Sequence, residues 1–357
     1  MCRPGDPESH SCNLAEHPFG VKDGTYPFTV VPPCSNGYMA KTDRNNPRRS
    51  SASDSRMSLM EFMREYPDDA TCLEKIWRER FSPDGTHAHC PKCGTDRVFK
   101  KYPIQNRRTA WSCTKKGCGH HIHPLVGTIF EKSSTSLHLW FYAMYVMAST
   151  RCGISAKQLE REIGVTYKCA WRMFHLIRTQ LMGQDGTEPL QGVVETDETF
   201  VGGKPRKSDR ATMTRRESRQ WAERKETVWG AVERDGRVVA KVIPFSGAGD
   251  IRPRVLENVK HDATLYSDGF VVYRTMGYNH AWVDHKREEY VRGDVHTQTI
   301  EGFWSIMKGG LNGVYRGAVS KKFLQSYVDE YAFHYNYRTA MGDPDPFRVL
   351  VTRATQA

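Results

Sequence analysis

Residues 193–203 read Val-Val-Glu-Thr-Asp-Glu-Thr-Phe-Val-Gly-Gly, and this stretch decides the fold. β-Branched and apolar residues dominate it and a glycine pair ends it, which is typical of a buried strand. The strand nevertheless carries three carboxylates. Because side chains alternate along a strand, Glu195, Asp197 and Thr199 share one face, whereas Glu198 points to the other. A buried carboxylate needs a metal ion or hydrogen-bond donors, so we expect a functional acid here; the alternative is an edge strand with solvated acids.

Two later stretches supply matching acids. Residues 263–269, Ala-Thr-Leu-Tyr-Ser-Asp-Gly, predict a short strand that ends on Asp268. Residues 297–308 predict a helix that carries Glu301 on a polar stripe with Ser305 and Lys308. Its apolar stripe has helical spacing and consists of Ile300, Phe303, Trp304, Met307 and Leu311. Two strand acids and one helix acid suit hard divalent cations, Mg²⁺ or Mn²⁺, which take oxygen ligands.

Composition favours a polyanionic partner. The chain has 357 residues, enough for two or three domains, and a formal net charge of +11. The longest apolar run, residues 137–148, is too short to cross a bilayer and predicts a buried helix. The N-terminus lacks a signal-peptide pattern. Ten irregularly placed cysteines, four of them in two close pairs, favour the reducing cytoplasm and a metal site over a disulfide framework.

The first 56 residues are rich in Pro, Gly, Ser, Asn and Asp and lack a sustained apolar period. They predict a disordered tail. A second interpretation is that the true start is Met57, where a helical pattern opens abruptly. Residues 57–80 then predict one or two short helices.

Four cysteines predict a structural metal site. Cys90 and Cys93 form one pair, Cys113 and Cys118 form another, and each pair closes a glycine-containing turn. The two pairs are separated by residues 94–112, and this separation is typical of a zinc ribbon, in which two knuckles hold one tetrahedral Zn²⁺. Nearby histidines are not needed as ligands because four thiolates suffice.

The same ribbon carries basic and aromatic side chains whose composition suits a DNA backbone; the alternative is a solvated hairpin. They are Lys100, Lys101, Tyr102, Arg107, Arg108, Trp111, Lys115 and Lys116.

Residues 155–174 have the pattern of a helix-turn-helix, after a predicted helix at 136–150. Gly164 makes the turn, and the apolar positions, including Trp171, face inward. Lys168 and Arg172 remain outward, with Thr166 and Tyr167, where a recognition helix meets bases and phosphates. Helix pairs that only pack show a similar pattern, so both interpretations stay open.

After residue 191 the pattern changes to strands. Residues 204–225 form a strongly basic insertion, beginning with Lys204, that we interpret as a loop contacting nucleic acid or as a solvated linker. Two strands joined at Asp235-Gly236 follow, and strands then alternate with helices up to a long helix at 321–338. This order is compatible with an α/β ribonuclease-H-like fold, with Asp197 on the first strand and Asp268 on the fourth.

The motifs together resemble a known family, the DDE transposases of bacterial insertion sequences that have an N-terminal zinc ribbon and helix-turn-helix. The resemblance covers about residues 57–340. It rests on residues 195–204 (ETDETFVGGK), 266–269 (YSDG), 296–308 (HTQTIEGFWSIMK), 313–315 (GVY) and 333–338 (FHYNYR). It departs at Gln298, where many relatives have Asn, and at Gly309, where a basic residue is common.

The resemblance implies that Asp197, Asp268 and Glu301 are catalytic and bind Mg²⁺ or Mn²⁺. It implies DNA cleavage at the ends of the element and strand transfer into target DNA, by a homo-oligomer on double-stranded DNA in the cytoplasm. Lys308, two turns beyond Glu301, is a candidate phosphate contact or a solvated lysine. Rival interpretations are a nuclease without strand transfer, an inert DNA-binding regulator and a carboxylate-pair glycosidase, the last disfavoured by the basic charge.

The expected organisation is multidomain. Its parts are a tail or misassigned start (1–56), N-terminal helices with a zinc ribbon (57–130), a helix-turn-helix region (131–185), a ribonuclease-H-like catalytic domain (186–345) and a C-terminal tail (346–357).

Overall fold

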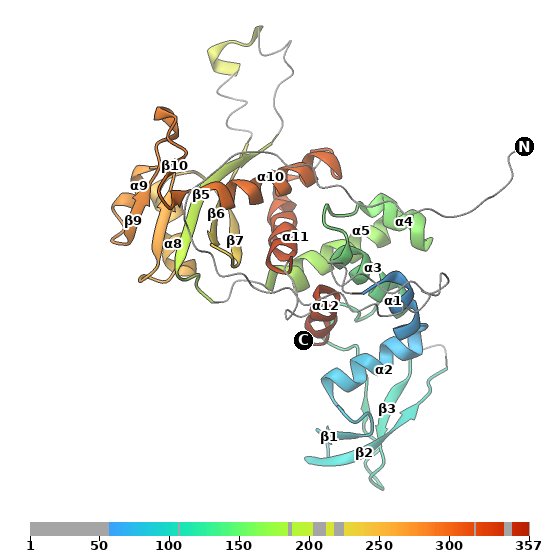
Figure 1. Cartoon of the computed structure of the whole chain (residues 1–357). Helices are drawn as coiled ribbons and strands as arrows, with labels where there is room; N and C mark the ends of the chain where they lie inside the picture. The colour runs from blue at the N-terminus through green and yellow to red at the C-terminus, as the bar shows by residue number, and fades with distance from the viewer. Residues whose placement is uncertain are drawn as a thin grey trace, which may run out of the picture. The chain divides into compact units, whose positions relative to one another are not determined.

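The computed structural model describes residues 57–105, 108–184, 188–202, 212–217, 225–317, 319–338 and 345–356 (Figure 1). The predicted tail of residues 1–56 lies outside the described residues. So do Arg107 and most of the basic insertion, including Lys204.

Two short helices begin the described chain, as the sequence predicts: α1 (Leu59–Glu65) and α2 (Asp69–Arg80). Ser58 and Glu61 form a capping box on α1, and the Asp68 side chain accepts from the Thr71 amide of α2. These caps satisfy amides that a helix leaves unpaired at its start, which explains where both helices begin.

A four-stranded antiparallel sheet follows, with strand order β1-β2-β3-β4. Its strands are β1 (His87–Cys90), β2 (Thr95–Tyr102), β3 (Ala110–Cys113) and β4 (His121–Ile122). The two turns that carry the cysteine pairs therefore lie at the ends of this sheet's strands.

The predicted helix and helix-turn-helix elements are present as α3 (Leu137–Ser149), α4 (Ala156–Ile163) and α5 (Tyr167–Leu176). Gly164 ends α4 with φ of +67°, a left-handed conformation that glycine adopts without strain. Helix α5 continues as a π-helical turn, η1 (Ile177–Leu181), and a 3-10 turn, η2 (Met182–Gln184). Trp171 differs from expectation, because it is only half-buried and its ring packs against His175 and Phe323.

A five-stranded mixed sheet forms the C-terminal half, with order β7-β6-β5-β8-β9. Strand β6 is antiparallel to β5 and β7, whereas β8 and β9 run parallel to β5. The strands are β5 (Val193–Val201), β6 (Glu226–Glu233), β7 (Val238–Ile243), β8 (Thr264–Ser267) and β9 (Asn279–Trp282). The predicted sequence of strands is confirmed, and β5 occupies the centre.

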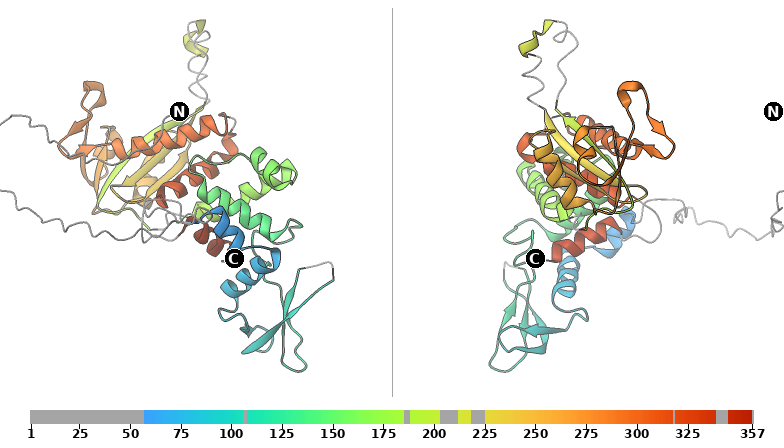
Figure 2. Two further views of the ribbon diagram at one scale, coloured as in Figure 1. Left: turned by 45° about the vertical axis from the view of Figure 1, so that its right-hand side comes forward. Right: turned by 90° about the vertical axis from the view of Figure 1, so that its left-hand side faces the viewer.

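Helices cover both faces of this sheet (Figures 1 and 2). On one face α8 (Ala248–Asn258) and α9 (Val271–Arg274) pack on alternate residues such as Trp229 and Ala231. On the other, α10 (Gln298–Gly313) and α11 (Leu324–Asn336) pack on Val228 and Val232. The period-two alternation along β6 thus divides two apolar cores, as expected for a three-layer α/β/α arrangement. The remaining short elements are η3 (His285–Arg287), β10 (Val291–Arg292), β11 (Val295–His296) and η4 (Lys321–Phe323).

The C-terminal segment requires a correction. Residues 346–357 were expected to be a tail, but Pro346–Thr355 form helix α12. Its buried residues Phe347, Leu350, Val351 and Ala354 belong to the same core as α1 to α5 and the N-terminal sheet. The spacing i, i+3, i+4, i+7 of these residues gives the helix one continuous apolar face, which accounts for its burial.

Truncation to Met57 should leave folding and DNA binding intact, because α1 and α2 bring their own caps and the described core begins at Met57. Thermal melting and DNA titration of the full chain and the truncated chain test this. A large fall in melting temperature on truncation would contradict it.

Adjacent glycines of α10 offer a sharp test of its packing on α11. A Cβ at Gly310 would lie 1.8 Å from the Tyr331 hydroxyl, whereas a Cβ at Gly309 would meet nothing within 4 Å. Gly310→Ala should therefore destabilise the protein by about 1–3 kcal/mol through overpacking. Gly309→Ala should stabilise it by up to about 1 kcal/mol, since alanine favours the helix. Denaturant unfolding of the two variants measures both effects; equal stabilities would disprove the close approach.

Candidate active site and metal centre

The predicted register of β5 is confirmed. Asp197 pairs with Gly230 of β6 and lies on the face covered by α10, while Glu198 pairs with Trp229 and lies on the opposite face. Both side chains are largely buried within the sheet's centre. The strand therefore holds two consecutive carboxylates in different environments.

Asp268 follows the last residue of β8, the parallel neighbour of β5. Because Glu195 pairs with Tyr266, continuing the register by two residues brings Asp268 beside Asp197. Its carboxylate is exposed and accepts a hydrogen bond from the Phe270 amide at 3.2 Å.

Glu301 lies in the first turn of α10, and half of its side chain is exposed. The Thr297 hydroxyl donates to its Oε1 at 2.9 Å, and His285 Nε2 lies 3.8 Å from the same oxygen. Thr297 therefore fixes the direction in which this carboxylate points.

A tryptophan connects α10 directly to Asp197. Trp304 Nε1 donates to Asp197 Oδ2 at 3.0 Å, so the buried indole satisfies its N–H on a carboxylate. Gly230 makes room for this ring, because a Cβ there would lie 2.5 Å from Trp304 Cη2. A glycine on β6 and a tryptophan on α10 together orient Asp197.

Asp197 interacts electrostatically with both Asp268 and Glu301. Burial and the negative charges of Asp268 and Glu301 together raise the pKa of Asp197 to about 6, although the hydrogen bond from Trp304 opposes the shift. Burial also raises the pKa of Glu198 to about 8, although the Tyr273 hydroxyl, which donates to it, opposes that shift. Carboxyl groups that raise one another's pKa would be stabilised in their ionised form by a bound cation.

The carboxylate oxygens of the three acids do not lie as close together as the ligand atoms of a bound metal ion. Within the described part of the chain, the four predicted cysteines form the group of potential ligands whose donor atoms all lie within 4.8 Å of one another. Asp197, Asp268 and Glu301 do not form such a group, so gathering them on one ion requires side-chain rotation.

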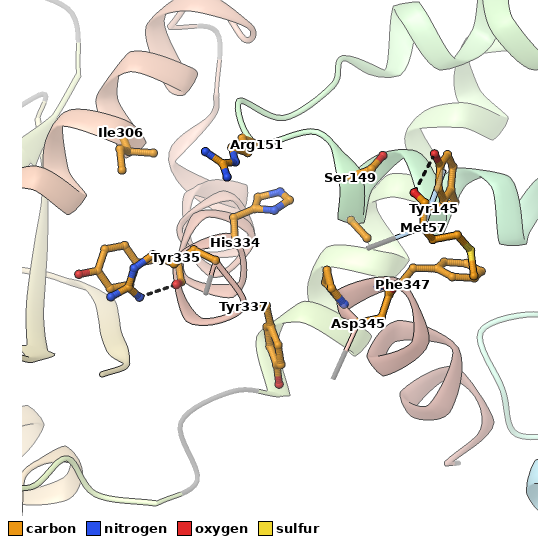
Figure 3. A pocket seen from close by; sticks show the side chains of 13 residues that line it. Met57, Tyr145, Ser149, Arg151, Ile306, His334, Tyr335, Tyr337, Asp345 and Phe347 are labelled. Atoms are coloured by element: carbon orange, nitrogen blue, oxygen red, sulfur yellow. Dashed lines mark hydrogen bonds between the residues drawn. The ribbon is translucent and has the colours of Figure 1, made fainter. Parts of the chain in front are cut away.

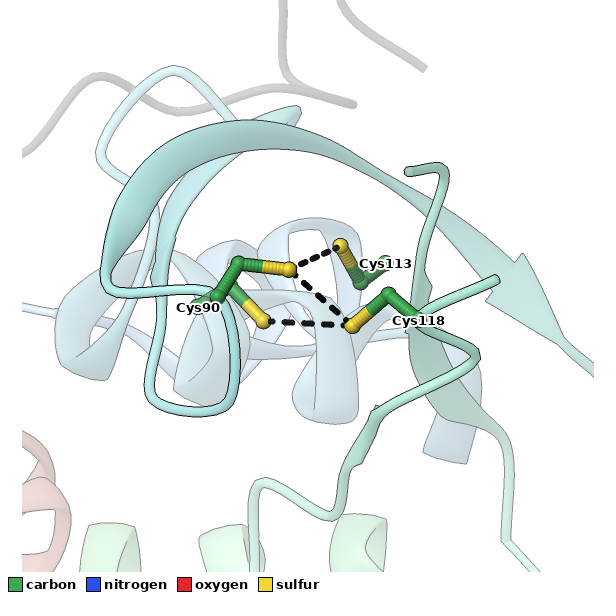
Figure 4. Close-up of side chains that lie close together, drawn as sticks. Cys90, Cys113 and Cys118 are labelled. Carbon is green, nitrogen blue, oxygen red and sulfur yellow. Dashed lines mark hydrogen bonds between the residues drawn. The ribbon is translucent and has the colours of Figure 1, made fainter. Parts of the chain in front are cut away.

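Cys90, Cys93, Cys113 and Cys118 meet as predicted (Figure 4). The Sγ atoms of Cys90 and Cys118 are 3.8 Å apart, and those of Cys93 and Cys113 are 4.0 Å apart. Thiolates at 2.3 Å around a tetrahedral ion would lie about 3.8 Å apart. The Cys93–Cys118 separation is shorter, 3.1 Å. The cluster could thus hold a metal ion with small adjustments, and neighbouring histidines are not members of it.

Some of the ribbon side chains predicted to suit DNA have partners within the protein. Trp111 is 2% exposed, and its ring stacks on Trp77 at 4.7 Å, so it is a core residue. Lys101 pairs with Glu74 at 2.8 Å, and Arg108 donates to the carbonyls of Ser133 and Thr135. Alternation along a strand did not reveal that α2 covers one face of this sheet.

The predicted outward positions of the helix-turn-helix are exposed. Lys168 and Arg172 lie on the open surface of α5, with Thr166 and Tyr167 at its start. Lys308, by contrast, is half-buried on α10 and engaged in an interaction.

The protein has a cavity of about 420 Å³ (Figure 3). It is lined by the C-terminal parts of α3 and α11 and the start of α12, including Tyr145, His334 and Phe347. Asp197, Asp268 and Glu301 do not line it, so this cavity does not belong to the acidic site. The described residues contain no helix long and apolar enough to cross a membrane.

Sequence reasoning missed the residues that hold the acids. Trp304 was interpreted only as part of the apolar stripe, and Thr297 and His285 were not singled out. A buried indole N–H needs an acceptor, and this requirement could have indicated that Trp304 binds a nearby carboxylate.

Comparison with known proteins agrees with this architecture. Residues 189–336 match the ISXO2-like transposase domain, a range that contains all three acids but neither the cysteine cluster nor the helix-turn-helix. The chain is similar to the uncharacterized protein in transposable element ISH50 of Halobacterium salinarum. The two are 33% identical over 255 residues, which is 67% of this chain and 82% of the relative. That relative comes from an archaeon, so the bacterial host expected from the resemblance is not a property of the group. The chain belongs to the ISXO2-like family of insertion-sequence DDE transposases.

Proposed function

We propose that this protein is a transposase that binds the ends of its insertion sequence and catalyses Mg²⁺-dependent DNA cleavage and strand transfer. The observation that carries the proposal is the convergence of Asp197, Asp268 and Glu301. They come from the central strand, its parallel neighbour and a covering helix, and the last two raise the pKa of the first. The strand order β7-β6-β5-β8-β9, in which β6 is antiparallel to β5, supports a ribonuclease-H-like fold for this domain.

These residues fit Mg²⁺ or Mn²⁺ by the chemistry of their donors. All three are carboxylates, and Asp197 is held where negative charge is costly. Bound divalent ions would activate the attacking hydroxyl and stabilise the leaving oxygen of an in-line phosphoryl transfer. Trp304 donates to one oxygen of Asp197 and Thr297 donates to one oxygen of Glu301, so each carboxylate keeps its second oxygen for an ion once the side chains rotate together.

DNA binding is assigned to the exposed face of α5 and to basic segments. The exposure of Lys168 and Arg172 on α5 supports contacts with base edges and phosphates, and Lys204 begins the basic insertion that follows β5 in the sequence. Lys308 lies on the same helix as Glu301 and is proposed to contact phosphate when DNA is bound. We expect a homo-oligomer on DNA, working in the cytoplasm on the host nucleoid.

The cysteine cluster is proposed to hold one structural Zn²⁺. Four thiolates at near-tetrahedral separations leave no open position, which is typical of structural rather than catalytic sites. The ion would join the turns that follow β1 and β3 and would so stabilise the four-stranded sheet.

The test is to incubate the purified full chain with DNA that flanks its own gene, with and without Mg²⁺, and to follow cleavage and joining separately. Cleavage at the element's ends with insertion into a target plasmid is the expected result. Cleavage without joining would indicate a ribonuclease-H-like nuclease. Binding without any metal-dependent cleavage would indicate an inert DNA-binding regulator, and either outcome would overturn the proposal.

A further inference from the structure

Glu195 is a fully buried carboxylate that lies on the same face of β5 as Asp197, two residues before it. Burying a carboxylate is unfavourable unless donors replace the water that it loses. The resemblance to DDE transposases assigns it no role, and its burial therefore calls for an explanation from its contacts.

Both carboxylate oxygens of Glu195 are fully engaged. Oε2 accepts from the backbone amides of Thr299 at 2.8 Å and Ile300 at 3.2 Å. Oε1 accepts from the Thr299 hydroxyl at 2.9 Å and Arg234 Nε at 3.0 Å, and His296 Nδ1 lies 3.2 Å away. A carboxylate offers about four acceptor positions, so these donors saturate it. Glu195 is therefore not available as a fourth metal ligand.

The two amides that Glu195 binds are the second and third of α10. A helix normally satisfies such amides with the side chain of its own N-cap residue. Here the N-cap residue, Thr297, makes no capping hydrogen bond, and its hydroxyl is instead directed at Glu301. The central strand thus supplies the cap that the helix lacks, and its negative charge suits the positive end of the helix dipole.

We propose that Glu195 is a positioning residue that caps α10 from β5 and thereby sets Glu301 relative to Asp197. This inference deepens the proposed function and rests on it. With α10 fixed at its N-terminus, Thr297 can hold Glu301 and Trp304 can reach Asp197 within the same short segment of helix. Because Glu195 caps the helix, the hydroxyl of Thr297 can donate to Glu301.

The primary test uses Glu195→Gln in the full chain. Glutamine keeps the shape, but its amide nitrogen cannot accept, so either Arg234 or α10 loses an acceptor, and in both orientations α10 loses the negative charge that favours its N-terminus. Glu233→Gln is the matched control, because Glu233 lies in the same sheet and accepts from the amides of Gln191 and Arg237, away from α10. Thr299→Val is a milder second variant that removes one hydrogen bond of Glu195 and leaves the backbone amides unchanged.

Two readouts besides activity are needed. Hydrogen–deuterium exchange of the peptide that contains Thr299 and Ile300 should accelerate at least about fivefold in Glu195→Gln, as expected for loss of an N-cap. Mn²⁺ affinity, measured by electron paramagnetic resonance without DNA, should fall ~10- to 100-fold, as is usual when a residue behind a metal ligand is lost. Thr299→Val should show smaller changes in the same directions, and Glu233→Gln should show neither.

The outcomes separate this inference from the proposed function. Unchanged exchange at the start of α10 in both Glu195→Gln and Thr299→Val would overturn the capping role. Accelerated exchange with unchanged Mn²⁺ affinity would overturn the positioning role. If the unaltered protein itself bound no Mn²⁺ and cut no DNA, the proposed function would fail, while the exchange measurement would still decide the capping of α10.

Discussion

Asp197→Asn, Asp268→Asn and Glu301→Gln are each expected to abolish DNA cleavage and joining while leaving DNA binding largely intact. The amide keeps the size of each side chain but removes the negative charge that holds a divalent ion. Loss of a residue that acts with others as one unit typically costs several orders of magnitude in rate, and we expect at least about a 10³-fold fall. A cleavage assay on the element's ends, at saturating Mg²⁺, measures it.

DNA affinity should survive because the proposed contacts are made by the exposed face of α5 and the basic segments, not by the acids. Affinity could even rise slightly in the Asp268 variant, since its exposed carboxylate repels phosphate. Fluorescence anisotropy with labelled end DNA separates this effect from loss of catalysis.

Glu198→Gln is the control for the same strand. Glu198 faces the opposite side of the sheet, where it is bound by the Tyr273 hydroxyl, and glutamine retains an oxygen for that contact. We expect its effect on cleavage to be far smaller than that of Asp197→Asn. If Glu198→Gln abolished Mg²⁺-dependent cleavage while Asp197→Asn retained it, the assignment of the site would be wrong.

The elements that carry the acids could be predicted because their patterns are local. An abundance of β-branched residues marks β5, and an apolar stripe with helical spacing marks α10; both have the predicted position and facing. Helix α12 also has a local signal, which is the helical spacing of Phe347, Leu350, Val351 and Ala354. The segment is short, and the pattern was interpreted as a tail.

What the sequence could not reveal are the contacts between distant segments. Glu195 and Thr299 are 104 positions apart, and Trp304 and Asp197 are 107 apart. Neither pair has a spacing rule, because both depend on how α10 docks onto the sheet. The same holds for Trp111, whose partner Trp77 belongs to another element, so that a ring interpreted as a DNA contact is part of the core.

Removal of the proposed zinc ion should produce the largest structural effect. The purified protein should contain one Zn²⁺ per chain, and chelation, or a Cys90→Ser and Cys113→Ser double substitution, should unfold the four-stranded sheet. Structural zinc contributes about 10–16 kcal/mol of binding free energy in small zinc domains, which becomes folding free energy. Three of this sheet's four strands are short, and without the ion the sheet depends on packing such as that of Trp111 on Trp77 of α2.

The loss should be confined at first to the N-terminal part. The cores on the two faces of the five-stranded sheet contain no residue of the cysteine cluster, whereas the core that includes α2, α3 and α12 contains Cys90 and Cys113. Hydrogen–deuterium exchange should therefore accelerate in β1 to β4 and α2 while β5 to β8 stay protected. Cys152→Ser is the matched control, because Cys152 is exposed and lies outside the cluster. Metal analysis that found no zinc in the natively purified protein would refute the assignment. Uniform loss of protection across both halves would instead show that the two parts fold as one cooperative unit.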